Sequence, residues 1–234
     1  MLSVCMATYN GGRFLREQLE SILSQLDDGD ELIISDDSST DDTISIIESF
    51  HDSRIKLFYN EKHGVNQNFE NALIHSKGDI ICLSDQDDVW RKGKVDFVRQ
   101  AMKNYDLVVH NAEIVDSNGN SLGYDYFSLM PQSDGFWANL WKSRFLGCCM
   151  AFNREILDEA LPFPPQIAGH DYWIGMLGAA KYRVLFDKQI FLSYRRHGGN
   201  TSTSAEPSDT SWFYRIVEKR MGIVWCVAMR NLKK

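Results

Sequence analysis

The sequence predicts an α/β fold with a doubly wound, mostly parallel sheet, flanking helices and a C-terminal amphipathic helix. In its first half, short apolar runs alternate with apolar residues at helical spacing, a pattern typical of strand–helix–strand units. Hydrophobic residues make up 44% of the 234 residues, enough for a sizeable core in one domain. A basic segment with helically spaced apolar residues closes the chain.

Four strands are expected in the first half, at residues 2–8, 31–35, 55–59 and 79–83. Apolar residues at helical spacing follow the first two runs, and Gly64 opens a further helix. Ser38, Ser39 and Thr40 are the candidate caps of the second helix. Because the strands are expected to run parallel, their carboxyl ends meet at one rim, where such sheets bind their ligands.

The second half is less regular. Strands are predicted at 107–110, 184–186 and 190–194, and helices at 137–145, 154–161 and 171–180. Asn118 and Gly119 indicate a turn between short strands. The aromatic residues Phe136, Trp137 and Trp141 recur at helical spacing, and we expect them to pack in the core; the alternative is a wall of an acceptor site.

Composition excludes several classes of protein. The formal net charge of −7 argues against nucleic-acid binding, which needs a basic face. The 5 cysteines contain no Cys-x-x-Cys pair and indicate reduced thiols, as in a cytoplasmic protein, rather than a disulfide framework or a zinc site. The apolar run at 2–7 lacks the basic region of a secretory signal, and the run at 223–229 is too short to span a bilayer.

Polar side chains follow three of the predicted strands. They are Thr8, Tyr9 and Asn10 after the first strand, Asp36 and Asp37 after the second, and Asp85, Gln86, Asp87 and Asp88 after the fourth. Each group alone is common in turns, because Asp and Asn bond to their own backbone. Together on one rim, the carboxylates repel one another unless a cation or hydrogen-bond donors offset their charge.

The alternation of Asp85 and Asp87 lets two carboxylates on an extended segment reach one hard cation. Oxygen ligands suit Mg²⁺ or Mn²⁺, which keep open positions for substrate phosphates. The sequence therefore predicts a site for a metal ion with a diphosphate. The alternative is that Asp87 or Asp88 caps the following helix.

Three segments, at 3–10, 34–41 and 83–90, resemble the family 2 glycosyltransferases of GT-A fold. The Asp-Gln-Asp-Asp-x-Trp form of the last segment is most similar to the rhamnosyltransferase-type members, which build bacterial surface polysaccharides. The resemblance covers nearly all of the first two hundred residues. It divides the chain into a nucleotide-sugar-binding half (1–110), an acceptor-binding and catalytic half (111–210) and a basic amphipathic C-terminal helix (211–234).

The resemblance also implies roles at matching positions. The residues after the first strand would line the nucleotide pocket, and Asp37, or Asp36, would accept a hydrogen bond from the N3–H of a uracil or thymine base. Asp85 would lie near the donor ribose or sugar. Asp87 would be the principal protein ligand of Mn²⁺ or Mg²⁺, which offsets the charge on the departing diphosphate.

His170 and Asp171 match the place where the family carries its base. Asp171 would take the proton of the acceptor hydroxyl as it attacks the anomeric carbon with inversion, although the family often has Glu where this chain has His170. The alternative is that Asp171 caps its helix. Arg196 and His197 match the region that closes over the donor, where His197 would bind the diphosphate or complete the metal shell; otherwise both are solvated loop residues.

The implied partners are a nucleoside diphosphate sugar, either dTDP-rhamnose or a UDP-hexose, and a glycan or lipid-linked acceptor. The Gln-x-x-Arg-Trp signature of processive synthases is absent from the sequence, which favours transfer of one sugar per encounter. Three alternatives are a sugar nucleotidyltransferase, a metal-dependent phosphohydrolase built on His170 and Asp171, and a non-catalytic module that binds sugar nucleotides.

Residues 211–234 carry six basic side chains and one acidic one, about +5, whereas the rest of the chain carries about −12. Apolar residues recur at helical spacing from Trp212 to Val227. Such a helix can lie on the anionic inner face of the cell membrane, near a lipid-linked acceptor. It can equally dock on its own domain or on a second subunit in a homodimer.

Overall fold

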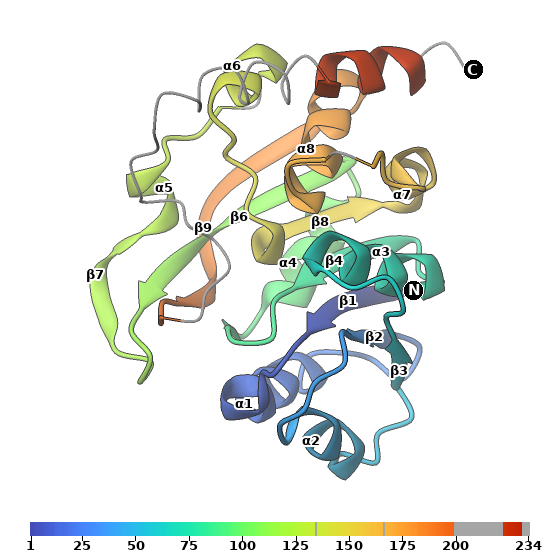
Figure 1. The fold of residues 1–234 in the computed structure, drawn as a ribbon. Coiled ribbons are helices and arrows are strands. Elements are labelled where there is room, and N and C mark those ends of the chain that lie inside the picture. Colours follow the sequence, from blue (N-terminus) through green and yellow to red (C-terminus); the bar gives the residue numbers. More distant parts are fainter. Residues whose placement is uncertain (134, 166, 199–221, 231–234) are drawn as a thin grey trace.

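A single mixed sheet forms the centre of the computed structural model, which describes residues 1–133, 135–165, 167–198 and 222–230 (Figure 1). The strand order is β3-β2-β1-β4-β8-β6-β9-β5, with β7 paired to β6. Parallel pairs form the first half of the chain, and antiparallel pairs join the second half to it. The predicted α/β class with a largely parallel sheet is confirmed.

The parallel half contains the four strands that the apolar runs predict, β1 (Leu2–Thr8), β2 (Glu31–Asp36), β3 (Ile55–Tyr59) and β4 (Ile80–Ser84). The side chains of β1, β2 and β4 are mostly apolar and buried, as expected for strands covered on both faces, whereas those of the edge strand β3 are half-buried or exposed. The helices of this half are α1 (Gly12–Leu23), α2 (Thr43–Ser49), α3 (Val65–His75) and α4 (Lys94–Ala101). Helices α1 and α2 lie on one face of the sheet and α3 lies on the other (Figure 1).

The second half extends the sheet with strands of both directions. Its strands are β5 (Val89–Trp90), β6 (Leu107–Val115), β7 (Ser121–Asp125), β8 (Met150–Asn153) and β9 (Val184–Arg195). Its helices are α5 (Tyr126–Leu129), α6 (Phe136–Trp141), the 3₁₀ turn η1 (Gly147–Cys149), α7 (Arg154–Ala160) and α8 (His170–Lys181). The turn predicted at Asn118-Gly119 joins β6 to β7, with Gly119 at a φ of +84°.

Several sequence-based boundaries were wrong. The strands predicted at 184–186 and 190–194 form one strand, β9, whose pairing with β6 shifts register beside His110 and Asn111 and so continues past the polar interruption. The helix predicted at 137–145 ends at Trp141. Strands β5 and β8 and helix α4 were not predicted, because each is short and lacks a strong apolar period.

The predicted caps of the second helix were also wrong. Helix α2 begins only at Thr43, and Asp42 occupies its N-cap position. Ser39 instead donates its hydroxyl and its backbone N–H to the carboxylate of Asp36, at 2.6 and 2.8 Å. The serine therefore closes the turn after β2, which is the competing use of such residues.

The prediction that the aromatic residues of α6 pack in the core is wrong for both tryptophans. Trp137 is 68% exposed and Trp141 is 65% exposed, whereas Phe136 lies partly buried against the core. The buried face of this six-residue helix consists of Asn139 and Leu140 instead. Helical spacing puts Trp137 and Trp141 on one face, but it does not show which way that face points.

Residues 222–230 form a helix that docks on the domain. Ile223 and Val227 are 4% and 5% exposed, and Arg230 donates to the carbonyl oxygens of Leu161 and Pro162 at 3.1 and 2.7 Å. Trp225 on the outer side is 64% exposed. The rest of the predicted helix, at 211–221 and 231–234, lies outside the described residues. None of the helices in the described ranges is long and apolar enough to cross a membrane.

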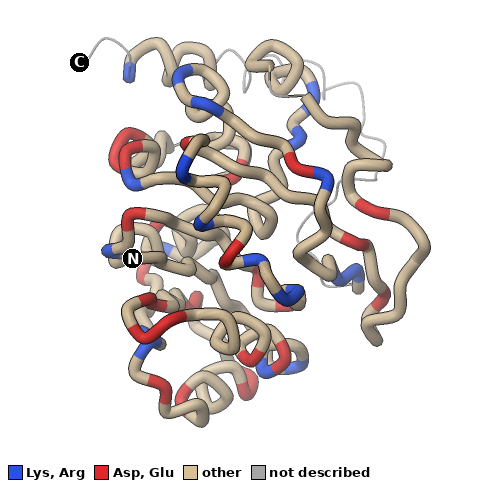
Figure 2. The backbone as a smooth tube through the Cα atoms, turned by 180° about the vertical axis from the view of Figure 1, so that it is seen from behind, with Lys and Arg blue, Asp and Glu red and all other residues tan. Residues whose placement is uncertain are grey.

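Acidic residues crowd the part of the molecule around α1 and α2, whereas the only charged residue of the helix at 222–230 is Arg230 (Figure 2). All 5 cysteines are free thiols, and four of them are buried. The thiols of Cys5 and Cys82 have pKa values raised by burial, in agreement with the prediction of reduced core cysteines.

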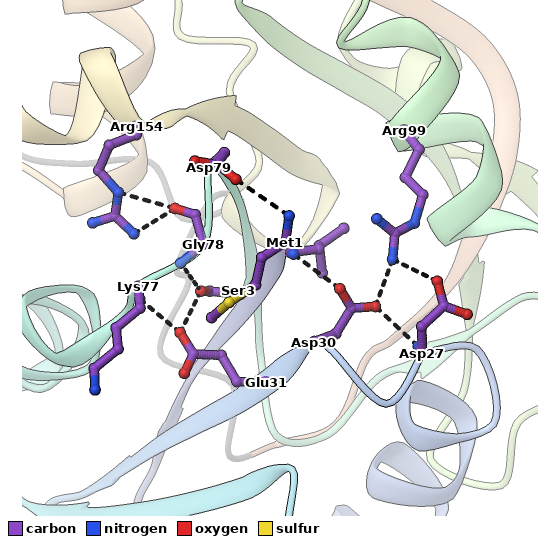
Figure 3. A network of polar contacts seen from close by, with 11 residues as sticks. Met1, Ser3, Asp27, Asp30, Glu31, Lys77, Gly78, Asp79, Arg99 and Arg154 are labelled. Atoms are coloured by element: carbon purple, nitrogen blue, oxygen red, sulfur yellow. Dashed lines mark hydrogen bonds and ion pairs between the residues drawn. The ribbon is translucent and has the colours of Figure 1, made fainter.

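A polar network ties the amino ends of β1, β2 and β4 together, at the end of the sheet away from the predicted rim (Figure 3). The Glu31 carboxylate accepts from the Ser3 hydroxyl and the Lys77 N–H at 2.6 Å each, and from Lys56 at 2.5 Å. Asp30 accepts from the backbone of Leu2 at 2.9 Å. These contacts satisfy buried polar groups where the strands begin and leave the opposite ends for function.

Candidate active site

The carboxyl ends of β1, β2 and β4 lie side by side, as the parallel topology predicts. Thr8 pairs with Asp36 across β1 and β2, and Met6 pairs with Ser84 across β1 and β4. The three polar segments that follow these strands are therefore brought to one rim. The Thr8 hydroxyl donates to the Asp36 carboxylate at 2.8 Å, which joins the first two segments directly.

Asp36 and Asp37 have different surroundings. Asp36 is 1% exposed, and its carboxylate accepts from Thr8 and twice from Ser39. Asp37 is less enclosed, with its side chain 14% exposed, and it accepts from Asn60, His63 and the Gly64 N–H at 2.8 to 3.0 Å. Both carboxylates accept from three local donors, so exposure is what distinguishes them: Asp37 is the more accessible to a ligand.

Tyr9 and Asn10 form the turn that connects the rim segments. The side-chain amide of Gln86 pairs with the backbone of Tyr9 in both directions, at 2.9 and 3.0 Å. Asn10, at a φ of +47°, accepts from the Thr40 N–H at 2.8 Å. A Cβ on Gly11 would stand 2.1 Å from the Gln86 Oε1, so a side chain there would displace the Gln86 amide from its pairing with Tyr9.

A group of acids lies behind the rim. One ligand atom from each of Asp85, Asp88 and Cys148 lies within 4.8 Å of the others. Burial, with the Asp87 and Asp171 carboxylates nearby, raises the pKa of Asp85 to about 7. Asp88 is fully buried and accepts from the Arg195 N–H at 2.9 Å, while its Oδ2 finds no hydrogen-bond partner of good geometry among the described residues.

Asp87 contacts the segment that follows β9. Its Oδ2 lies 2.7 Å from the His197 Nε2, and the two side chains are 15% and 17% exposed. The His197 ring lies 4.8 Å from the ring of Phe14 on α1. Arg196, between β9 and this histidine, donates its backbone N–H to the carbonyl oxygen of Val115 and is half-buried. The structure thus brings together the two predicted metal ligands, which lie 110 residues apart.

The alternative that Asp87 or Asp88 caps the next helix does not hold. Helix α4 begins at Lys94, and Gly93 occupies its N-cap position. Asp87 and Asp88 instead face β9, through His197 and the Arg195 backbone. Both carboxylates therefore serve contacts between distant parts of the chain.

Asp171 lies in the first turn of α8 and acts electrostatically on Asp85. Its Oδ1 accepts from the Tyr172 N–H at 2.7 Å, whereas Gly169 holds the N-cap position, so Asp171 is not the N-cap of α8. Gly147 has no side chain, which allows the η1 turn to lie close to this acid: a Cβ at Gly147 would stand 3.4 Å from the Asp171 Cβ. Asp171 therefore belongs to the same acidic site as the carboxylates after β4.

His170 has a packing role beside this acid. Its ring stacks on Phe69 at 3.8 Å between centroids, and its backbone N–H donates to the Asn66 side chain at 2.9 Å. Burial lowers the pKa of His170, so the imidazole is held neutral. A stacked, neutral ring without a second histidine nearby in the described residues gives no support to a phosphohydrolase built on this pair.

The donor set fits a hard divalent cation. Asp87 supplies an oxygen at the rim and His197 a nitrogen directly beside it, a combination that suits Mn²⁺ and is compatible with Mg²⁺. The neighbouring Asp85 and Asp88 both have raised pKa values, since each carboxylate is buried near other negative groups. A cation would relieve this repulsion.

Sequence reasoning missed several residues that shape the site. Gln86 was taken only as the spacer between two acids, yet it holds the turn after β1. Cys148 was not singled out, and Arg195 was not distinguished from Arg196. The positions of Gln86 and Arg195 inside recognised motifs were the available signals; for Cys148 the sequence offered none.

Residues 3–161 match the sequence model of the family described as Glycosyl transferase family 2. The chain belongs to this family. The match spans all three rim segments and ends before Asp171 and His197, which lie in the part of the chain beyond it. The geometry above is therefore that of a glycosyltransferase.

Curated relatives of this glycosyltransferase include enzymes with named activities. The dTDP-rhamnosyl transferase RfbG of Shigella flexneri is 30% identical over 242 residues, covering 94% of this chain and 78% of the relative. A GalNAc(5)-diNAcBac-PP-undecaprenol beta-1,3-glucosyltransferase of Campylobacter jejuni is 35% identical over 202 residues, covering 83% of this chain and 64% of the relative.

Solved glycosyltransferase structures share the fold. S. aureus TarS 1-349 in complex with UDP-GlcNAc aligns with a TM-score of 0.73 at 20% identity, over 95% of this chain and 66% of that chain. The mannosyltransferase PcManGT from Pyrobaculum calidifontis, in complex with GDP-Man and Mn²⁺, aligns with a TM-score of 0.61 at 18% identity, over 99% of this chain and 73% of that chain. The chain thus spans about two thirds to three quarters of the length of these structures.

Proposed function

We propose that this glycosyltransferase transfers one sugar per encounter from a nucleoside diphosphate sugar to a glycan or lipid-linked acceptor, with inversion and with the help of Mn²⁺ or Mg²⁺. The observation that carries the proposal is the meeting of Asp87 with His197 beside Asp85, with Asp171 acting on the same group. These residues come from the ends of β4 and β9 and the start of α8. Two sides of one reaction centre are thereby supplied by separate halves of the chain.

For the metal, Asp87 is the principal protein ligand and His197 the second, while Asp85 faces the donor ribose or sugar. When bound, the ion supplies electrostatic stabilisation of the departing diphosphate. We assign Arg196, which follows β9 directly, to the same diphosphate. The Asp87 Oδ2 and the His197 Nε2 lie 2.7 Å apart, which supports the assignment of both residues to one metal ion.

For the acceptor, Asp171 removes the hydroxyl proton as the oxygen attacks the anomeric carbon. The supporting observations are its place at the start of α8, outside the N-cap position, and its electrostatic effect on Asp85. A carboxylate within hydrogen-bond reach of the acceptor hydroxyl can accept its proton as a general base. Inversion follows from direct in-line attack by the acceptor.

For the donor, the rim residues Thr8, Tyr9 and Asn10 line the nucleotide pocket and Asp37 accepts from a pyrimidine N3–H. Tyr9 is 58% exposed at this rim, which leaves its ring available to a base. We favour dTDP-rhamnose or a UDP-hexose. The support is the Asp-Gln-Asp-Asp-x-Trp segment together with the named activity of the Shigella relative.

For the acceptor lipid, the relevant surface is the C-terminal segment. The helix at 222–230 buries Ile223 and Val227 on the domain and leaves Trp225 exposed, so one helix combines docking with an outward aromatic residue. We propose that this outward side contacts the inner face of the membrane, in bacterial surface polysaccharide synthesis. A homodimer through the docked face is disfavoured, because that face is already covered by its own chain.

The decisive experiment is a product assay with the purified chain. UDP-glucose, UDP-GlcNAc and dTDP-rhamnose are offered with a polyprenyl-diphosphate sugar and with free oligosaccharides, with Mn²⁺, Mg²⁺ or chelator. A glycoside of inverted anomeric configuration, formed only with metal, is the expected result. A sugar nucleotide as product would indicate a nucleotidyltransferase, and binding without turnover of every donor would indicate a binding module.

A further inference from the structure

Arg195 joins four parts of the molecule behind the candidate metal ligands. It is the last residue of β9 and is 4% exposed. Its guanidinium donates to the Asp87 carbonyl oxygen at 2.9 Å, to the Glu17 carboxylate at 2.7 Å and to the Ser117 carbonyl oxygen at 3.2 Å. The same group lies 4.9 Å from the ring centre of Phe14.

These contacts act on both candidate metal ligands. The bond to the Asp87 carbonyl holds the backbone that carries the Asp87 carboxylate, and the Arg195 N–H holds the next acid, Asp88, at 2.9 Å. His197 lies only two residues further along the chain and packs on the Phe14 ring that also faces the guanidinium. Movement of Arg195 would therefore displace Asp87 and His197 relative to each other.

Geometry rather than charge makes this contact important. Glu17 is 61% exposed, and an ion pair open to solvent contributes little stability. The carbonyl contacts to Asp87 and Ser117 instead need donors at fixed directions, which the planar guanidinium provides and an ammonium group does not. The Arg195 side chain is buried, and three of its five guanidinium N–H groups donate to protein oxygens, so the group is not placed as a ligand of the donor diphosphate.

We infer that Arg195 is a positioning residue that sets the Asp87 carboxylate and the His197 ring for the divalent metal, and that it does not touch the donor. The inference rests on the proposed function for the identity of the metal site. It also assigns a role to the β6–β7 turn, because Ser117 fixes one end of the guanidinium. Arg195 thereby connects the metal ligands to a hairpin in the second half of the chain.

The test compares Arg195→Lys with the wild-type chain and with Arg99→Lys. Arg99 is a matched control, since its guanidinium also bridges distant elements, contacting Asp27 and Asp30 at 3.0 and 2.6 Å, away from the rim. Two quantities are measured in each protein. The first is Mn²⁺ affinity with and without UDP, followed by the spin-resonance signal of free Mn²⁺; the second is the NMR signal of the His197 ring without metal at one fixed pH.

We expect Arg195→Lys to lower Mn²⁺ affinity by roughly 10-fold or more, the usual scale for losing a group that orients metal ligands. The His197 signal should move, and metal-free UDP binding should stay unchanged. Arg99→Lys should alter thermal stability but neither of the other readouts. If Arg195→Lys does not fold, Glu17→Gln removes a single anchor and should move the His197 signal less, in the same direction.

Wild-type Mn²⁺ affinity and an unmoved His197 signal in the folded lysine variant would overturn the inference. An equal loss of metal-free UDP binding would also overturn it, because Arg195 would then be a donor ligand. If the wild-type chain binds no Mn²⁺ even with UDP, the metal part of the proposed function fails. The His197 signal still decides whether Arg195 positions that ring.

Discussion

The Asp87 Oδ2 lies 2.7 Å from the His197 Nε2, although the two residues are 110 positions apart and come from the ends of different strands. Asp87 follows β4, in the parallel half, and His197 follows β9, whose pairing with β6 brings it back to the rim. Because this pair lies at the rim and outside the apolar core, changes to either residue should reduce the metal function while the chain stays folded.

Asp87→Asn should reduce metal-dependent transfer by more than roughly 100-fold while the chain stays folded, because the amide keeps the shape but loses the anionic ligand. Initial rates over a range of Mn²⁺ concentrations, with circular dichroism of the same samples, measure this. Asp42→Asn at an exposed site before α2 is the control and should transfer normally. Wild-type rates in the Asp87 variant would remove Asp87 from the metal site.

Asp171→Asn should lower turnover by roughly 100-fold or more, the scale of general-base help, with little change in donor affinity. Turnover with a saturating donor, together with calorimetric titration of UDP and Mn²⁺, separates the two quantities. His170→Gln is informative beside it: since His170 packs on Phe69, this variant should lose stability more than rate. A variant of Asp171 that lost only donor affinity would indicate positioning instead of proton transfer.

Gly11→Ala should weaken donor binding, because the new Cβ would stand 2.1 Å from the Gln86 amide that pairs with the Tyr9 backbone. Removing the clash with Gln86→Ala makes the two changes non-additive, so the double variant should bind no worse than Gln86→Ala alone. Gly29→Ala has no neighbour within 4 Å among the described residues and serves as the control. Titration with UDP measures the binding affinity of the four variants and of the wild-type chain. Strictly additive losses of binding free energy in the double variant would contradict the proposed contact.

Glu31→Gln should destabilise the fold by about 2 kcal/mol or more, because its buried carboxylate accepts three charge-assisted or short hydrogen bonds. These bonds hold the pKa of Glu31 below its usual value although burial alone would raise it. The carboxylate's contribution is therefore present above the unfolded-state pKa and is lost as the pH falls through the folded-state value. Urea unfolding at pH 7 and at acidic pH should show the variant and wild type converging in acid.

The matched control for Glu31→Gln is Asp79→Asn. Asp79 also joins the network of Figure 3, through the terminal amine of Met1 at 3.2 Å, but its side chain is 85% exposed. An exposed pair contributes little, so this variant should unfold close to wild type at every pH. Equal losses in both variants would show that burial does not decide the strength of this network.

Trp225→Ala should leave thermal stability unchanged, because the side chain is 64% exposed, but should reduce binding to anionic liposomes. Val227→Ala, on the buried face, should lower stability and so gives the opposite pattern. Cosedimentation at low and high salt, with a chain ending at Ser211 for comparison, measures the membrane part. Equal binding by the full chain and the shortened chain would leave docking as the only role of the helix.

The sequence by itself determined the parallel half and the three rim segments. Apolar runs and helical spacing are local patterns that can be read from the sequence. Because parallel strands bring their carboxyl ends to one side of the sheet, the sequence alone places Thr8, Asp36 and Asp85 together. The family resemblance of these segments added the expected chemistry. Buried strands of this kind leave little freedom for a different arrangement.

Only the tertiary structure decided which groups in each segment serve the fold and which face the site. Asp36 and Asp37 are neighbours with the same side chain, yet Asp36 is committed to Thr8 and Ser39, whereas Asp37 is less enclosed. The residue spacing in the sequence likewise did not predict the exposure of the α6 tryptophans or the contacts of Arg195. Each depends on which distant surface packs against a side chain, and that choice is set by the free energy of the whole fold rather than by local spacing.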